Sequence, residues 1–217
     1  MVNPLALTDI EADRLVLCEG PQDRAFLGAL HQDRKLPPAQ ITCPSNHKLP
    51  GGKDGFRLFL LAIRAWTSFP RLKELVIVAD SDADPTAAFQ SVAEHLRAAG
   101  GYPVPVTPHD KAAGSPSVVV LMVPWHDLQG ALETICFDAA AGAHPAEAGC
   151  VNKFASCTGA DNWPPQKFAK MRIHALVAAT HRQNPGVGLG NVWAQAPSLI
   201  PISAPAFDRI ADFFRNL

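Results

Sequence analysis

Four short apolar segments, each followed by a segment with helical periodicity, constrain the fold more than any other feature of the sequence. The apolar segments are residues 15–18, 40–43, 75–79 and 118–123. Continuous runs of Val, Ile and Leu, in place of alternating ones, are typical of parallel strands covered on both faces. Helical patterns begin at Pro21 and recur over residues 56–63, 89–99 and 128–136. This alternation predicts an α/β fold: an open, mostly parallel sheet of about four strands with helices on both faces.

The C-terminal third is predicted to be an extension of this sheet. Residues 103–117 and 139–166 are rich in Pro, Ala and Gly, and we expect them to be loops. Residues 166–182 and 205–217 have helical patterns. We therefore expect an α/β core over residues 1–140, and a loop with a helical extension packed on that core over residues 141–217.

Composition excludes several classes of protein. The chain has 217 residues, of which 47% are hydrophobic, with 19 Lys and Arg against 20 Asp and Glu, so it is neither disordered nor uniformly basic. Neither a targeting signal nor an apolar run of the roughly 20 residues of a membrane span is visible. Five cysteines without a CxxC pair favour a reducing compartment. We expect a cytoplasmic protein that does not contact a membrane.

Charge is distributed unevenly along the chain. Residues 1–149 contain 12 basic and 17 acidic residues, and residues 150–217 contain 7 basic and 3 acidic ones. This favours an acidic site facing a basic C-terminal region, although chance variation among solvated faces explains it equally well. Lys167, Lys170 and His174 lie at helical spacing and share one side of a predicted helix. That side is a candidate phosphate-binding surface, or an ordinary solvated face.

Acidic residues follow three of the predicted strands, at the edge where ligands gather in a parallel sheet. Glu19 directly follows the first strand, and Asp23 lies one helical turn further on. Glu133 lies in the helix after the fourth strand, among apolar neighbours. Taken singly, each has a structural explanation: acidic residues are favourable at a helix N-terminus and are common on a solvated helix face.

The strongest chemical signal is the alternation of Asp80, Asp82 and Asp84 directly after the third strand. Three carboxylates this close repel one another unless a cation neutralises them, and hard oxygen ligands suit Mg²⁺, Mn²⁺ or Ca²⁺. An EF-hand loop is disfavoured, because Pro85 and Ser91 stand where that loop has Gly and Glu. The structural alternative is an aspartate that caps the following helix.

A glycine-rich segment, residues 51–55, precedes the second helical pattern. Backbone N–H groups around Gly52, with Lys53 as the counter-charge, are candidates for phosphate binding. The segment is not a Walker motif, because no Lys-Ser or Lys-Thr pair closes it. A plain turn is the alternative.

An apolar strand ending in Glu-Gly, followed later by an apolar strand ending in Asp-x-Asp, resembles the Toprim domain, a catalytic fold found in topoisomerases, bacterial primases and nucleases of the overcoming-lysogenization-defect family. The chain is most similar to those nucleases and to small stand-alone Toprim-related bacterial proteins of unknown function. The similarity spans nearly the whole chain, and its short motifs are Glu19-Gly20-Pro21-Gln22-Asp23-x-x-Phe26-Leu27, Gly51-Gly52-x-Asp54, Leu132-Glu133, and Arg172-Ile173-His174 followed by Pro185-Gly186 and Gly190.

The resemblance implies a function and the residues that perform it. Asp80 and Asp82 would hold a divalent metal, and Glu19 would be a further ligand or a general acid/base. Asp23 and Glu133 would be outer or second-metal carboxylates, and Asp84 is a further candidate metal ligand, with one or two Mg²⁺ or Mn²⁺ ions. The expected activity is hydrolysis of nucleic-acid phosphodiesters, which metal-activated water can perform. The only tyrosine, Tyr102, is predicted to lie in a loop, so strand passage of the topoisomerase kind is not expected.

Two other functions remain open at this level. One is a phosphatase of the haloacid-dehalogenase type with Asp80 as nucleophile, although the residues after Asp82 are Ala83 and Asp84, where that family has Gly-Thr. The other is a non-catalytic module that holds a metal, a nucleotide or a protein partner such as an ATPase.

Overall fold

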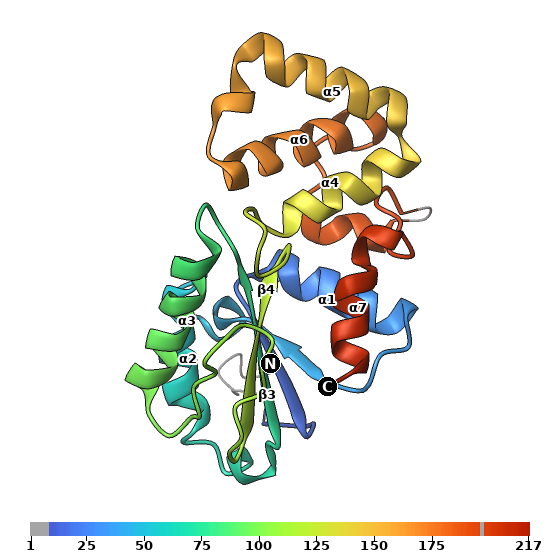
Figure 1. Cartoon of the computed structure of the whole chain (residues 1–217). Helices are drawn as coiled ribbons and strands as arrows, with labels where there is room; N and C mark the ends of the chain where they lie inside the picture. Colours follow the sequence, from blue (N-terminus) through green and yellow to red (C-terminus); the bar gives the residue numbers. More distant parts are fainter. Residues whose placement is uncertain (1–8, 196–197) are drawn as a thin grey trace.

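A four-stranded sheet lies at the centre of the molecule (Figure 1). The structure, a computed structural model, describes residues 9–195 and 198–217. The strands are β1 (Arg14–Cys18), β2 (Gln40–Thr42), β3 (Glu74–Asp80) and β4 (Ser117–Val123), and every pair is parallel in the order β2-β1-β3-β4. The predicted parallel α/β fold is therefore confirmed.

In the part of the chain that the structure describes, seven α-helices follow or connect the strands. They are α1 (Pro21–Asp33), α2 (Asp54–Ile63), α3 (Pro85–Ala99), α4 (Leu132–Ala143), α5 (Pro145–Thr158), α6 (Pro165–Thr180) and α7 (Asp208–Arg215). Short 3₁₀ helices cover Pro44–His47, Phe69–Arg71, Ala160–Asn162, Leu189–Ala194 and Pro205–Phe207. Within the described residues, no helix has both the length and the apolar character that crossing a membrane requires.

Helices cover both faces of the sheet, as predicted (Figure 1). Successive residues of a strand point to opposite faces, so Val16 and Cys18 of β1 join the core shared with α1 and α7. Leu15 and Leu17 join the core shared with α2 and α3. Because both faces are buried, nearly every strand position is apolar, which explains the continuous apolar runs.

Two expectations about the C-terminal half are wrong. The predicted loop over residues 139–166 is mostly helix, because α4 continues to Ala143 and α5 follows from Pro145. Alanine is the strongest helix former, proline suits the first helical position, and Gly159, with φ of 73°, ends α5 in the left-handed conformation. The fourth helix also begins at Leu132 and not at Leu128, which lies in a turn after β4 and is 47% exposed.

The predicted C-terminal helical extension is present. Helices α4, α5 and α6 form a group beyond one end of the sheet, and α7 runs beside α1 (Figure 1). The rings of Phe26 and Phe207 lie 4.9 Å apart, and Arg34 on α1 is ion-paired with Asp208 on α7. The core on the α1 face therefore includes side chains from both halves of the chain.

Candidate metal and phosphate site

The strand order creates a switch point between β1 and β3. The chain leaves β1 toward β2 on one side and leaves β3 toward β4 on the other. In open α/β sheets, ligands bind in the crevice that opens beyond the carboxyl ends of two such strands. Glu19 directly follows β1 and Asp80 is the last residue of β3, so topology brings together two residues that are 61 positions apart.

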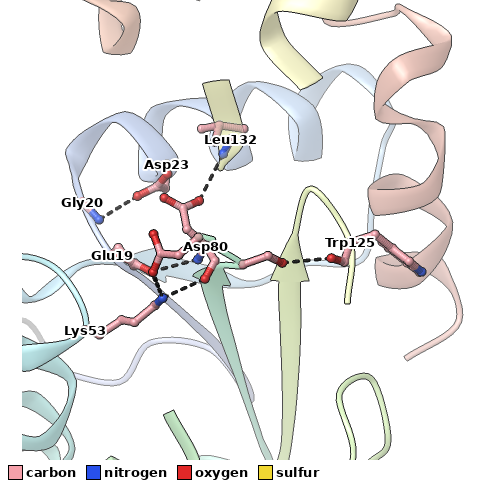
Figure 2. A network of polar contacts seen from close by, with 9 residues as sticks. Glu19, Gly20, Asp23, Lys53, Asp80, Trp125 and Leu132 are labelled. Atoms are coloured by element: carbon pink, nitrogen blue, oxygen red, sulfur yellow. Dashed lines mark hydrogen bonds and ion pairs between the residues drawn. The ribbon is translucent and has the colours of Figure 1, made fainter. Parts of the chain in front are cut away.

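A backbone hydrogen bond fixes the position of Glu19 against Asp80. The Asp80 N–H donates to Glu19 Oε1 at 2.8 Å (Figure 2). The Asp80 carboxylate points away from this bond, and its Oδ1 accepts the N–H of Leu132 at 3.1 Å. Leu132 is the first residue of α4, so the N-terminal end of this helix faces the Asp80 carboxylate, where a negative charge is favourable.

Four carboxyl groups line one cleft. Glu19, Asp23, Asp80 and Glu133 surround an open cleft of about 370 Å³, together with Lys170 and the residues from Gly20 to Gln22. Asp23 Oδ2 accepts the N–H of Gly20 at 2.8 Å, an arrangement that also caps α1. Glu133, in the first turn of α4, is only 5% exposed and lies 3.8 Å from Lys170 Nζ. The structure therefore brings Glu19, Asp23, Asp80 and Glu133 together.

Burial and the charges of neighbouring carboxylates raise the pKa of Glu19, Asp23 and Asp80. Burial beside Glu19 and Glu133 raises the pKa of Asp23 from 3.8 to about 7. Burial, followed by the charges of Glu19, Asp23 and Glu133, raises the pKa of Asp80 well above its usual value. Burial also raises the pKa of Glu19, against the opposing effect of Lys53. A cavity of about 10 Å³, the volume that one water molecule needs, is lined by Glu19, Asp23 and Asp80 together with apolar side chains of β3, β4, α1 and α4.

Asp82 belongs to a different set of contacts. Its carboxylate is ion-paired with Lys53, whose ammonium also donates to the carbonyl oxygen of Asp80 at 2.8 Å and lies 3.8 Å from Glu19 Oε1. Asp82 is 46% exposed at its side chain, and it does not line the cleft that holds Asp80. The two carboxylates of the Asp-x-Asp motif therefore face different partners.

Of the remaining predicted site residues, Gly52 and Lys170 line the cleft, and Asp84, Lys167 and His174 do not. Asp84 is the N-cap of α3 and accepts the N–H of Ala87 at 3.0 Å, which is the structural alternative for that residue. The Gly52 N–H donates to the carbonyl oxygen of Glu19 at 3.0 Å, so this N–H holds the loop against β1 and is not presented to a phosphate. Lys170 reaches the cleft, whereas Lys167 and His174 are exposed on α6 and do not line it.

The geometry bears on metal binding in two ways. Carboxylate oxygens are the ligands that Mg²⁺ prefers, and Glu19, Asp23 and Asp80 each use one oxygen for a backbone N–H. Among residues 9–195 and 198–217, however, no three Asp, Glu, His or Cys side chains form a ready set of metal ligands. The cleft carboxylates fit a divalent ion by type, and the set of Glu19, Asp80 and Asp82 does not converge.

Sequence reasoning missed two features of the site. The contact of Asp80 with the α4 N-terminus has no local signal, because that helix starts later than its apolar pattern predicts. Cys18 ends β1 and Cys43 directly follows the neighbouring β2, and the Cys18 thiol, followed by Ser45, lowers the pKa of Cys43 to about 6. The buried neighbours Cys18 and Thr42 are also joined by a thiol–carbonyl hydrogen bond of 3.2 Å.

Comparison with curated proteins and with solved structures found no match. A family model described as a protein of unknown function (DUF3226) matches residues 13–217, from the residue before β1 to the last residue of the chain. This match includes all four strands and every carboxylate of the cleft. The chain therefore belongs to the DUF3226 family.

Proposed function

We propose that this protein is a divalent-metal-dependent phosphodiesterase of the Toprim type that acts on nucleic acid, most simply as a nuclease. The observation that carries the proposal is the cleft at the switch point, where Glu19, Asp23, Asp80 and Glu133 face one open space beside Lys170. Carboxylates from three segments of the chain are concentrated there although the burial raises the pKa of three of them. Such a costly arrangement is typical of functional sites.

We assign different roles in the proposed reaction to different residues of the cleft. Glu19, Asp80 and Glu133 would hold the metal ion, which when bound supplies charge stabilisation and an acidified water to a phosphodiester. Asp23, with a pKa of about 7, is suited to accept and return a proton at neutral pH. Lys170 lies at the rim of the cleft with its side chain 54% exposed, so its ammonium is positioned to bind a phosphate. Lys167 and His174 extend this basic side along α6.

A direct cleavage assay tests the proposal. Labelled single- and double-stranded DNA and RNA would be incubated with the protein in Mg²⁺, in Mn²⁺ and in EDTA. We expect metal-dependent cleavage that Asp80→Asn abolishes and that Asp23→Asn slows on the order of 100-fold. Glu94→Gln, an exposed carboxylate of α3, is the matched control and should cleave normally. Cleavage that persists in EDTA or in Asp80→Asn would refute the proposal.

A second candidate function is a module that binds without turnover. The ion pair of Lys53 with Asp82, and the lack of a ready three-residue metal set among the described residues, favour this candidate. Metal binding by the wild type, without cleavage of any of the four substrates, would support it. The phosphatase alternative gains no such support, because a buried Asp80 with a raised pKa is a poor nucleophile.

A further inference from the structure

Lys53 lies where the Toprim resemblance places a metal ion. Its ammonium is surrounded by three oxygens, of which one belongs to the carboxylate of Asp82. Figure 2 shows the other two neighbours, the carbonyl of Asp80 and the carboxylate of Glu19, whose oxygens lie 2.8 Å and 3.8 Å away. Only 14% of the Lys53 side chain is exposed. An ammonium has three N–H donors and one positive charge, so it satisfies a ring of oxygens much as a small cation does.

We propose that Lys53 is a built-in cation that fills the position formed by Glu19, Asp82 and the Asp80 carbonyl, and that it thereby limits the site to one divalent ion. That ion would bind on the other side of Asp80, between Asp23 and Glu133. The location of this single ion rests on the proposed function, whereas the occupation of the first position by Lys53 does not.

The loop that carries Lys53 is fixed to the strand that carries Glu19. Gly52 adopts φ of +72° and donates its N–H to the Glu19 carbonyl oxygen at 3.0 Å. Gly55 packs so closely that a Cβ there would lie 2.0 Å from the Pro50 carbonyl oxygen. Lys53, between these two glycines, caps α2. Its ammonium therefore projects toward Asp82 from a firmly held backbone.

Asp82, the ion-pair partner of Lys53, also lies on a backbone that hydrogen bonds fix in position. Asp82 has φ of 52°, in the left-handed region that few residues other than glycine adopt. Its carbonyl oxygen accepts the N–H of Gly130 at 2.7 Å, which ties the turn after β3 to the turn after β4. This conformation directs the Asp82 side chain to Lys53, while the carboxylate of Asp80 faces Leu132.

The charges on the two sides of Asp80 explain why a metal ion is needed only on the side of Asp23 and Glu133. Lys53 compensates Asp82 and Glu19 on its side of Asp80. On the other side, Asp23, Asp80 and Glu133 have only the half-exposed Lys170, 3.8 Å from Glu133. Three carboxylates with one exposed lysine leave a deficit of positive charge that a divalent ion would supply.

Counting bound Mn²⁺ tests the inference. We would titrate Mn²⁺ into the wild type, Lys53→Met and Lys153→Met, and measure ions bound per chain by calorimetry and by electron paramagnetic resonance. Lys53→Met should bind one ion more than the wild type, and the extra ion should be lost in Lys53→Met/Asp82→Asn. Lys153, exposed on α5, does not line the cleft, so Lys153→Met makes the same substitution away from the site and should keep the wild-type number. Equal numbers in wild type and a folded Lys53→Met would overturn the inference.

A second variant covers the case in which Lys53→Met does not fold. Asp82→Asn in the otherwise wild-type chain removes the partner of Lys53 and should change the Mn²⁺ affinity less than threefold, because Asp82 is not a ligand. A loss of tenfold or more would make Asp82 a ligand and overturn the inference. If the wild type binds no Mn²⁺ and Lys53→Met binds one, the role of Lys53 as a built-in cation is supported and the metal-dependent function is refuted. If neither protein binds Mn²⁺, the role of Lys53 and the metal-dependent function are both refuted.

Discussion

Asp23 links proton binding at the site to the stability of the whole chain. Its pKa rises from 3.8 to about 7 on folding, chiefly through burial. The folded protein therefore holds this proton more tightly than the unfolded chain, so the free energy of unfolding decreases as pH rises from about 4 to about 7. This pKa shift corresponds to at most about 4 kcal/mol in the free energy of unfolding. The value is an upper limit, because the charges of Glu19 and Glu133 contribute to the same shift and titrate together with Asp23.

Asp23→Asn should remove this dependence. Asparagine still offers an oxygen to the Gly20 N–H, so the cap of α1 is kept. We expect the variant to be more stable than the wild type at pH 8 and nearly equal to it at pH 4.5. Urea unfolding in chelator at several pH values measures this, with Asp127→Asn, an exposed loop residue, as the control. Parallel pH profiles for Asp23→Asn and the wild type would contradict the assignment.

His109 should have the opposite pH dependence. It packs against Trp125, His126 and Phe213, and burial followed by the charges of His126 and Arg209 lowers its pKa from 6.5 to about 4. The unfolded chain therefore takes up a proton that the folded protein excludes, so stability is lost as pH falls below about 6.5. At pH 5 the loss is at most about 2 kcal/mol, because solvent screens part of the effect at this half-buried ring.

His109→Asn tests this, since asparagine tolerates the φ of 69° at this position. The variant should be less stable at pH 7.5, because it loses the ring contacts. Its further loss between pH 7.5 and pH 5 should be smaller than that of the wild type, by at most about 2 kcal/mol. His95→Asn on α3 is the control. An unchanged difference between the two pH values would show that His109 does not couple stability to pH.

At the scale of single elements, α3 depends on its N-cap. Asp84 accepts the Ala87 N–H, and Pro85 occupies the first helical position. Asp84→Ala should lower the free energy of unfolding by about 1 kcal/mol, and Asp84→Ser should restore most of it. Urea unfolding measures both, and Mg²⁺ titrations of the same variants should match the wild type. Weaker Mg²⁺ binding with unchanged stability would identify Asp84 as a ligand instead.

At the scale of the whole molecule, the C-terminal helices contribute buried side chains to the core on the α1 face. The core on the α1 face combines strand residues with Ile173 and Leu176 from α6 and with Phe207, Ile210 and Phe214 near the C-terminus. Helix α4 itself spans the expected boundary at residue 140. A fragment of residues 1–140 would keep α1 but would expose to water the apolar surface that α6 and α7 cover on this face.

We expect that fragment to lack a cooperative unfolding transition and to bind the dye ANS, whereas the whole chain unfolds in one transition. In the whole chain, Leu176→Ala should cost about 2–5 kcal/mol, because Leu176 is completely buried. Circular dichroism during urea unfolding measures both. A fragment of residues 1–140 with a sharp transition would show that the core needs nothing from α5, α6 and α7.

Local sequence determined the elements of this protein. All four strands are where the apolar runs predict them, because a strand buried on both faces leaves its signature in consecutive residues. The positions of Glu19 and Asp80 at strand ends follow from the same runs. The prediction from composition was wrong at α5. Its segment was predicted to be a loop because it is rich in Pro, Ala and Gly, although alanine itself favours helix.

Only the tertiary structure decided which of the acidic residues act together. The spacing of Asp80 and Asp82 makes them neighbours in sequence, but the positive φ of Asp82 turns its side chain to Lys53, while Asp80 faces α4. Asp23 and Glu133 join Asp80 because the strand order and the entry of α4 bring them to one cleft. Chain direction at a turn and contacts between distant segments are set by packing of the whole core, and no local pattern encodes them.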